Sequence, residues 1–308
     1  MPSRPTHAGN QFAGGRRRWR LPAAAILTLV AGCRCFNYDR EGAISPELAQ
    51  CRHYTHLSIA ALERGDVEQA ERLSSQAVEA FPNDAQARRG LADALWRRGK
   101  ATAAIDQLEI ARKISPDEPT LLVQLGEMYL ALDQWEAART LAADSLDADP
   151  SSARAWLLRG DTFRAAGRFD EALADYTRAS GMEPANPLIL RRLSVVSLAR
   201  REPQRALSYA RSLVDAYSPS EPPADALDLY GEILADLGRW TDAKDAYTQA
   251  AAAQATPERL CRLAEAELLA GEPNAARHTL DRVLASHPQH LQGLALRSRM
   301  NDAAPRRK

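Results

Sequence analysis

Two kinds of segment in this sequence carry residues that could do chemistry. The first is CRHYTH, in which Cys51, His53 and His56 fall within six residues, and thiolates and imidazoles are ligands for zinc and copper. Their spacing places the three side chains on scattered faces of one helix, and no second ligand pair follows at zinc-finger spacing. We therefore favour ordinary helix residues over a metal site, and we predict no metal and no cofactor.

Carboxylates gather in the second kind of segment, at residues 225–236 and 258–267. Paired carboxylates can act as general acid and base. Here they recur at helical spacing, without a nucleophile, a histidine base or a glycine-rich phosphate loop beside them. We predict no catalytic residue, and we interpret these carboxylates as a solvated or partner-facing surface.

The composition favours a helical protein with a sizeable core. The chain has 308 residues, of which 45% are hydrophobic and only 6% aromatic, and alanine is abundant. Net charge is zero, but residues 1–32 hold five arginines and no acid. The remainder has 35 basic against 40 acidic residues, a net charge of −5. Such a balance does not favour nucleic-acid binding.

A fixed period of 34 residues runs through most of the chain. It is marked by the alanines Ala70, Ala104, Ala138, Ala172 and Ala206 and by the prolines Pro82, Pro116, Pro150 and Pro184. A constant period of this length is typical of a helical repeat array. The segment SPSEPP, residues 218–223, adds three residues to the period before it resumes.

The pattern within each unit predicts two helices joined by a tight turn. In residues 155–184, Trp156, Gly160 and Phe163 share one face of a first helix. Gly167 follows in a turn, where a positive φ costs glycine little. Gly160 and Ala172 are small enough to let the two helices approach closely.

At these residues the sequence resembles the tetratricopeptide repeat (TPR) family, whose pattern is W…LG…Y…A…F…A…P. The resemblance implies an all-α protein, a right-handed α-solenoid of about seven TPR helix pairs plus a C-terminal helix. We expect the array at residues 50–288, followed by a terminal helix and charged tail at 289–308. The expected repeats lie near 51–82, 85–116, 119–150, 153–184, 187–218, 224–255 and 257–288.

The N-terminal segment resembles a bacterial lipoprotein signal. The basic stretch GRRRWR precedes the apolar run LPAAAILTLVAG, which is too short to cross a membrane as a helix, and Cys33 follows at once. The resemblance implies that residues 1–32 are removed, that Cys33 is acylated, and that residues 33–49 form a linker. Arg34, in place of aspartate, implies the outer membrane, with the array in the periplasm. A simply cleaved signal and an uncleaved anchor remain the alternatives.

The other cysteines leave one pairing open. If Cys33 is acylated, Cys35 and Cys51 could form a disulfide that fastens the linker to the first repeat. Cys261 is then expected to be a buried thiol that behaves as a small apolar residue.

The resemblance also implies which residues face the concave groove of the solenoid. By family position these are Arg89, Asp93, Trp96, Arg97, Arg154, Asp161, Arg164, Arg191, Asp225, Asp228, Glu232, Asp236, Glu258 and Glu265. The groove is then basic in its middle and acidic toward its C-terminal end, which would orient an extended ligand. Trp96, if exposed, would anchor it. The alternative, that these are ordinary solvated helix faces, remains open.

These features predict a noncatalytic scaffold or adaptor tethered to the cell envelope that holds a protein or peptide partner in its groove. A structural solenoid that assembles with itself is the alternative. An exposed apolar face on the helix expected at 289–300, formed by Leu291, Leu294, Leu296 and Met300, would permit such assembly. The sequence leaves the partner and the oligomeric state open.

Overall fold

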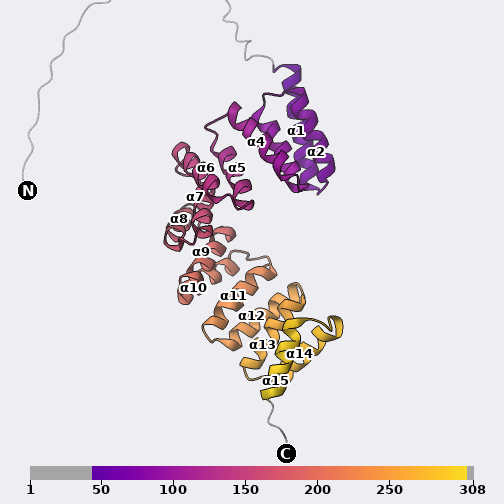
Figure 1. The fold of residues 1–308 in the computed structure, drawn as a ribbon, viewed down its shortest axis with the longest axis vertical. Coiled ribbons are helices and arrows are strands. Elements are labelled where there is room, and N and C mark those ends of the chain that lie inside the picture. The colour runs from indigo at the N-terminus through magenta and orange to yellow at the C-terminus, as the bar shows by residue number, and fades with distance from the viewer. Residues whose placement is uncertain (1–43, 304–308) are drawn as a thin grey trace, which may run out of the picture. The chain divides into compact units, whose positions relative to one another are not determined.

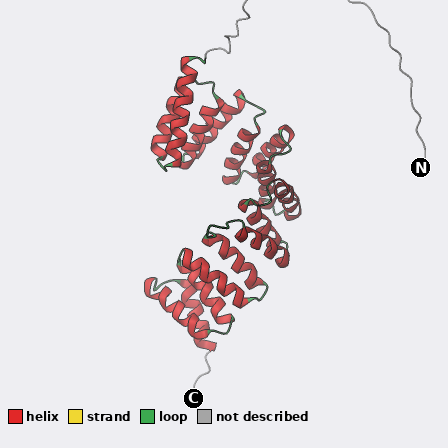
Figure 2. Cartoon of the chain, turned by 180° about the vertical axis from the view of Figure 1, so that it is seen from behind, coloured by secondary structure: helices red, strands yellow, loops and turns green. Residues whose placement is uncertain are grey.

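The structure is a computed structural model that describes residues 44–303, and that range holds fifteen helices and no strand (Figures 1 and 2). The helices are α1 (Pro46–Glu63), α2 (Val67–Ala80), α3 (Ala85–Arg97), α4 (Ala101–Ile114), α5 (Pro119–Ala131), α6 (Trp135–Ala148), α7 (Ala153–Ala165), α8 (Phe169–Met182), α9 (Pro187–Ala199), α10 (Pro203–Asp215), α11 (Ala224–Asp236), α12 (Trp240–Ala253), α13 (Pro257–Leu269), α14 (Pro273–Ser286) and α15 (Leu291–Ala303). None of the described helices is both long enough and apolar enough to span a bilayer.

Consecutive helices form antiparallel pairs, and each pair corresponds to one predicted repeat. The pairs run from α1–α2 to α13–α14, and α15 follows as a single helix. The second helix of each pair also packs against the first helix of the next, which gives the solenoid arrangement. The chain divides after Ala49, in the first turn of α1, and the described residues from Gln50 onward form one compact unit. The predicted all-α repeat fold is confirmed.

The turn inside each pair has one residue in the left-handed region. Gly167 has a φ of 73°, as its predicted turn position requires. Asp133 and Arg201 occupy the equivalent turns with φ values of 59° and 60°, although they carry side chains. The remaining turns are made at Gly65, Gly99, Gly238 and Gly271. The left-handed turn is therefore a feature of every repeat, with or without glycine.

Local capping fixes where several first helices begin. The side chains of Asp84, Ser152 and Asn186 accept backbone N–H groups of the first turn of α3, α7 and α9. Proline occupies the first position of α5, α9 and α13, where its missing N–H costs nothing.

Small residues at the helix crossings keep the pairs close together. The periodic alanines Ala70, Ala104, Ala138, Ala172 and Ala206 are fully buried. Gly160 of α7 lies against the ring of Tyr176 of α8, so closely that an added Cβ would come within 2.5 Å of Tyr176 Cε1. The predicted close approach of these two helices is confirmed, and the tyrosine ring explains it.

The last helix, α15, closes the C-terminal end of the described array. Leu296 and Met300 are buried in a cluster with Cys261, Leu280 and Val283 of α13 and α14. The prediction that both belong to an exposed apolar face is therefore wrong, because they complete the core of the final repeat. Leu291 is 83% exposed, and Leu294 is also exposed.

Candidate functional site

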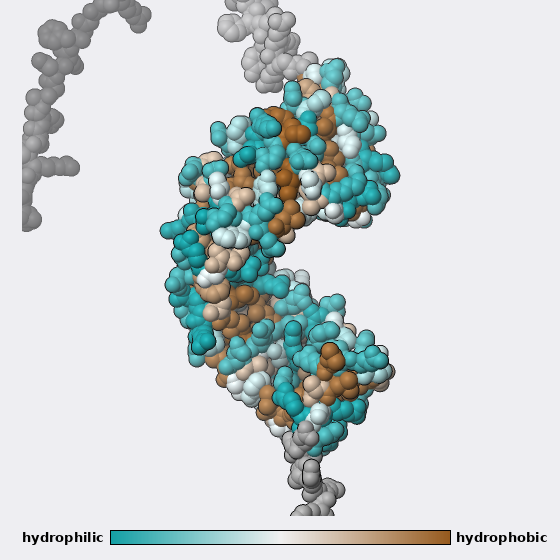
Figure 3. Space-filling view, viewed as in Figure 1, coloured by the Kyte–Doolittle hydropathy of each residue, from teal (hydrophilic) through white to brown (hydrophobic). Residues whose placement is uncertain are grey.

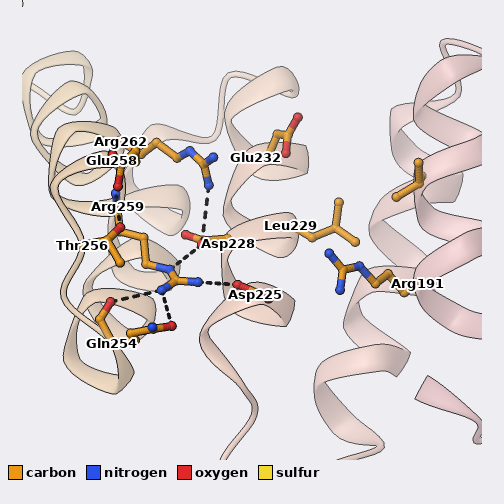
Figure 4. Close-up of a pocket in the computed structure, with 11 residues that line it drawn as sticks. Arg191, Asp225, Asp228, Leu229, Glu232, Gln254, Thr256, Glu258, Arg259 and Arg262 are labelled. Atoms are coloured by element: carbon orange, nitrogen blue, oxygen red, sulfur yellow. Dashed lines mark hydrogen bonds and ion pairs between the residues drawn. The ribbon is translucent and has the colours of Figure 1, made fainter. Parts of the chain in front are cut away.

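Three first helices, α9, α11 and α13, line a surface cavity of about 540 Å³ (Figure 4). Its walls are formed by Arg191, Val195, Asp225, Asp228, Leu229, Glu232, Gln254, Thr256, Glu258, Arg259 and Arg262. Five of the predicted groove residues, Arg191, Asp225, Asp228, Glu232 and Glu258, therefore lie around one cavity. Only Val195 and Leu229 among the lining residues are aliphatic, so the cavity is suited to a polar ligand.

A buried arginine of α13, Arg259, binds residues of α11 and of the connection before α13. Its Nε lies 2.6 Å from Asp228 Oδ2, a second guanidinium nitrogen pairs with Asp225, and Nη1 donates to Gln254 Oε1 at 2.7 Å. Arg262 Nη1 lies 3.5 Å from the same Asp228 oxygen. A buried carboxylate needs such partners, because losing one leaves an uncompensated charge. Asp225 and Asp228 are thus engaged within the protein.

Sequence reasoning missed Arg259 and Arg262, because neither falls at a family position that faces the groove. A signal was present in the printed sequence. Asp225 and Asp228 on one first helix are followed 34 residues later by Arg259 and Arg262 on the next. Two opposite-charge pairs at the repeat spacing indicate a contact between adjacent repeats, and the structure contains both pairs, Asp225–Arg259 and Asp228–Arg262.

Two charges on the cavity wall stand outside this network. Within the described residues no carboxylate lies within 4 Å of the Arg191 guanidinium, and no basic group lies within 4 Å of the Glu232 carboxylate. Figure 4 shows Arg191 on α9, across the cavity from Arg259, with Leu229 pointing toward it from α11. These are the charges that the cavity can offer to a ligand.

Glu258 lies at the far side of the same cavity and is only weakly engaged. His290 Nε2 is 3.6 Å from Glu258 Oε1, and the carboxylate side chain is exposed. Backbone N–H donation first, then Thr256 and His290, hold the pKa of Glu258 below its usual range. Glu258 therefore carries a negative charge at neutral pH.

Two of the four remaining predicted basic groove residues, Arg89 and Arg154, bridge neighbouring helices. Arg89 of α3 is largely buried and binds Glu118 Oε1 at 2.5 Å and Gln124 Oε1 at 3.1 Å. Arg154 of α7 binds Glu127 of α5 at 2.5 Å. Such contacts hold adjacent repeats together, so these arginines are not free charges.

Ion pairs also engage Asp93, Arg97, Arg164 and Glu265, whereas Asp236 stands apart. Arg97 pairs with Asp93 one turn away at 3.2 Å, and Glu265 pairs with Arg299 of α15 at 3.1 Å. Arg164 Nε lies 3.5 Å from Asp161 on its own helix. Asp236 is exposed at the C-terminal end of α11 and has no basic group within 4 Å in the part of the chain that the structure describes.

Asp161 is a structural carboxylate. It is 7% exposed, and its Oδ1 accepts the Tyr176 hydroxyl at 2.6 Å and lies 2.7 Å from Arg192 Nε. Burial and the Asp161 charge raise the pKa of Tyr176 above its usual value. These contacts join α7, α8 and α9, and they leave Asp161 little capacity for a ligand.

Trp96 does not stand free in the groove. Its ring is half-buried and packs against the apolar cluster that contains Leu91, Leu95 and Leu108. The condition for a partner anchor, an exposed ring, is therefore not met. Trp96 stabilises the core of the second repeat instead.

The residues considered for a metal site do not converge. Cys51 is buried between α1, α2 and α3, whereas His53 and His56 are exposed on α1. Across residues 44–303, no group of three or more His, Cys, Asp or Glu side chains is placed to hold a metal ion. Cys33 and Cys35 lie outside the described residues, so acylation of Cys33 and a Cys35–Cys51 disulfide stay predictions.

Cys261 and His290 form a contact that superficially resembles a catalytic pair. Cys261 Sγ lies 3.6 Å from His290 Nδ1, and the thiol is fully buried, as predicted. Burial, followed by the charges of Glu258 and Glu265, raises the pKa of Cys261 and keeps it protonated. His290 Nδ1 accepts the N–H of Gly293 at 3.2 Å, so the imidazole caps the start of α15. The contact is structural.

Comparison with known families agrees with this architecture. A sequence model described as "Tetratricopeptide repeat" matches residues 57–119, 123–187, 157–222 and 193–259, which together cover more than half of the chain. The chain belongs to the tetratricopeptide repeat family. TPR proteins are generally noncatalytic scaffolds for protein–protein interaction, and this chain has the fold of that class.

Solved TPR structures share the fold across much of this chain. A TPR protein from Parabacteroides merdae has a TM-score of 0.57 at 14% identity, covering 82% of this chain and 99% of its own. PilW, described as a type IV pilus biogenesis factor, has a TM-score of 0.56 at 17% identity and covers 80% of this chain and 97% of its own. YrrB, described as a TPR protein with an unusual peptide-binding site, has a TM-score of 0.53 at 17% identity. The match covers 62% of this chain and 97% of YrrB.

Proposed function

We propose that this protein is a noncatalytic scaffold that binds a protein or peptide partner on the surface formed by its first helices. The observation that carries the proposal is the polar cavity between α9, α11 and α13, in which Arg191 and Glu232 have no partner within the described residues (Figure 4). Beside them, the Arg259 network links α11 to α13. A preformed wall with unpaired charges favours binding, because little ordering is required when the ligand arrives.

The surface composition of the array supports a soluble docking body. Figure 3 shows hydrophilic residues over most of one face, with separate apolar patches among them. TPR proteins bind protein or peptide partners, and the structural relative YrrB is described as having a peptide-binding site. An extended peptide segment is therefore the ligand class that we propose.

We further propose that the array is tethered to the cell envelope through lipid on Cys33. The support is the sequence alone: a basic stretch, a short apolar run and Val30-Ala31-Gly32 immediately before Cys33. Several acyl chains would anchor the protein firmly, since each buried methylene contributes about 0.8 kcal/mol. Arg34 favours the outer membrane, which leaves the array in the periplasm.

Metabolic labelling and fractionation test the tether. The native chain should incorporate a labelled fatty acid and sediment with the envelope, whereas Cys33→Ser should not incorporate it and should be recovered in the soluble fraction. Cys51→Ser is the matched control and should behave as the native chain. If Cys33→Ser sediments like the native chain, the lipid tether is refuted.

Crosslinking in intact envelopes tests the scaffold role. A partner should be recovered with the native chain at a defined stoichiometry, and its crosslinks should map to α9, α11 or α13. If the crosslinks join only copies of this chain, the scaffold proposal fails and self-assembly takes its place. Size-exclusion chromatography separates the same alternatives, because self-assembly through Leu291 and Leu294 of α15 would give oligomers that Leu291→Ser and Leu294→Ser dissociate.

A further inference from the structure

The junction between the fifth and sixth repeats contains a second cavity of about 380 Å³ beside the first. It is lined mainly by apolar groups, among them Leu188 of α9, Leu213 of α10, and Tyr217 and Pro223 from the connection to α11. Leu188 is 47% exposed, so part of its apolar side chain is open to a ligand. We call this cavity the junction recess.

Arg191 lies where the junction recess meets the polar cavity. Both cavities are lined by Arg191 and Asp225, so they adjoin. Asp225 is already paired with Arg259. Arg191 is exposed and lacks a carboxylate within 4 Å among the described residues, so it is the positive charge available at this point.

The charges that line the polar cavity favour one class of anion over others. Asp225, Asp228, Glu232 and Glu258 also face the polar cavity, so its seven charged lining residues are three basic and four acidic. A phosphate dianion or a nucleic-acid strand would meet repulsion from these carboxylates. A single carboxylate beside Arg191 gains a charge-assisted hydrogen bond without placing a second negative charge near them.

The position of Arg191 also favours an acidic side chain over a chain terminus. Open cavity continues on both sides of Arg191, apolar on one side and polar on the other. A bound chain can therefore pass Arg191 in both directions. Beyond Leu229, the unpaired Glu232 is placed to accept a basic group from the same ligand (Figure 4).

We infer that the site binds an extended internal peptide segment with an apolar side chain in the junction recess, an adjacent Asp or Glu paired with Arg191, and a basic residue near Glu232. This inference rests on the proposed function and specifies the chemistry of its ligand. The apolar contact provides binding energy and the two charges select the sequence and fix its register.

Selection from random peptides displayed on phage tests the inference without a known partner. The probe is a library of peptides of about twelve residues, which span roughly 40 Å when extended. The bait is the full chain carrying Cys33→Ser, with and without Arg191→Glu. We expect the first bait to enrich peptides with an apolar residue next to Asp or Glu, and the second bait to lose that preference.

Affinity measurements on one selected peptide sharpen the test. Arg191→Glu should weaken binding by about tenfold or more, since a charge-assisted bond is replaced by repulsion. Exchanging the peptide's acidic residue for lysine should restore binding to Arg191→Glu. Leu188→Ser should also weaken binding. Arg211→Glu, a reversal at an exposed arginine of α10 outside both cavities, should have no effect.

The outcomes separate the inference from the proposed function. If no peptide is enriched on the native surface, peptide binding itself is refuted. If peptides are enriched but bind Arg191→Glu as tightly as the parent, peptide binding stands and the inference is overturned. Circular dichroism of each variant should show unchanged helix content, because Arg191 and Leu188 are exposed.

Discussion

Replacement of Gly160 by alanine tests whether the close crossing of α7 and α8 is required. An ideal Cβ at Gly160 would lie 2.5 Å from Cε1 and 2.7 Å from Cδ1 of Tyr176, whereas favourable carbon contacts are about 3.5–4.0 Å. The tyrosine ring cannot easily withdraw. Its side chain has no exposed surface, and its hydroxyl donates to Asp161 at 2.6 Å.

Two opposing contributions determine how much Gly160→Ala changes the free energy of unfolding. Alanine is favoured over glycine in a helix interior by about 1 kcal/mol. Overpacking a core costs about 1–3 kcal/mol, and two contacts with a fixed ring place Gly160→Ala at the upper end of that range. We therefore expect the free energy of unfolding to fall by about 2 kcal/mol. Gly90→Ala in α3, with no atom within 4 Å of the added Cβ, should raise it by about 1 kcal/mol.

Urea unfolding followed by circular dichroism measures both changes. In a Tyr176→Leu background the ring is absent, so Gly160→Ala should lose most of its cost. Two results would refute the reasoning. One is a Gly160→Ala variant at least as stable as Gly90→Ala, and the other is an undiminished cost in the Tyr176→Leu background.

Three further predictions concern the turns, the arginine network and a partly buried carboxyl group, and all can be measured by urea unfolding. Gly99→Ala should lower the free energy of unfolding by about 1 kcal/mol, because a φ of 74° strains a residue with a side chain. Arg201→Gly should raise the free energy of unfolding by a similar amount, because it relieves the same strain. Variants as stable as the native chain would contradict this. Arg259→Met should lower the free energy of unfolding by about 3–5 kcal/mol, because Asp228 is left buried without its main partner. Asp228→Asn in the Arg259→Met background should recover part of this loss. No recovery would count against the ion-pair explanation. Burial raises the pKa of Glu267 above its ordinary value of 4.5, so its charged form is disfavoured in the folded state. Glu267→Gln should therefore be more stable than the native chain at pH 7, and this advantage should disappear as the pH falls below about 4.5, where the native carboxyl is neutral in both states; an advantage independent of pH would exclude this cause.

The fold could be predicted from the sequence because its determinants are local. A helix pair depends on residues within one 34-residue unit: small residues at the crossing, a turn, and a cap or proline at the next start. Even where Asp133 and Arg201 replace the turn glycine, the same backbone bonds form. Gln134 N donates to Tyr129 O at 2.9 Å, as Lys100 N donates to Leu95 O at 2.9 Å in a glycine turn.

Whether each charged side chain is paired or free was harder to predict, because pairing depends on contacts between repeats. Family positions placed Asp161 and Asp228 in the groove, but both are buried by arginines that those positions do not include. Arg192 and Arg259 each reach their carboxylate from the following first helix. Whether a charge on a helix face is free or paired depends on the adjacent repeat, and the period alone does not specify it.

The three-residue change of period explains why the candidate site lies at this junction. Four residues, 183–186, connect α8 to α9, whereas eight, 216–223, connect α10 to α11. The longer connection supplies Tyr217 and Pro223 to the junction recess. It also shifts α11 relative to α9: Arg191 and Asp225 are 34 residues apart, yet they fall at the fifth and second positions of their helices. Arg259 reaches both Asp225 and Asp228 from the next first helix, while Arg191 has no carboxylate within 4 Å among the described residues at the edge of the recess. The irregular junction therefore places the apolar surface of the junction recess beside the available charge of Arg191.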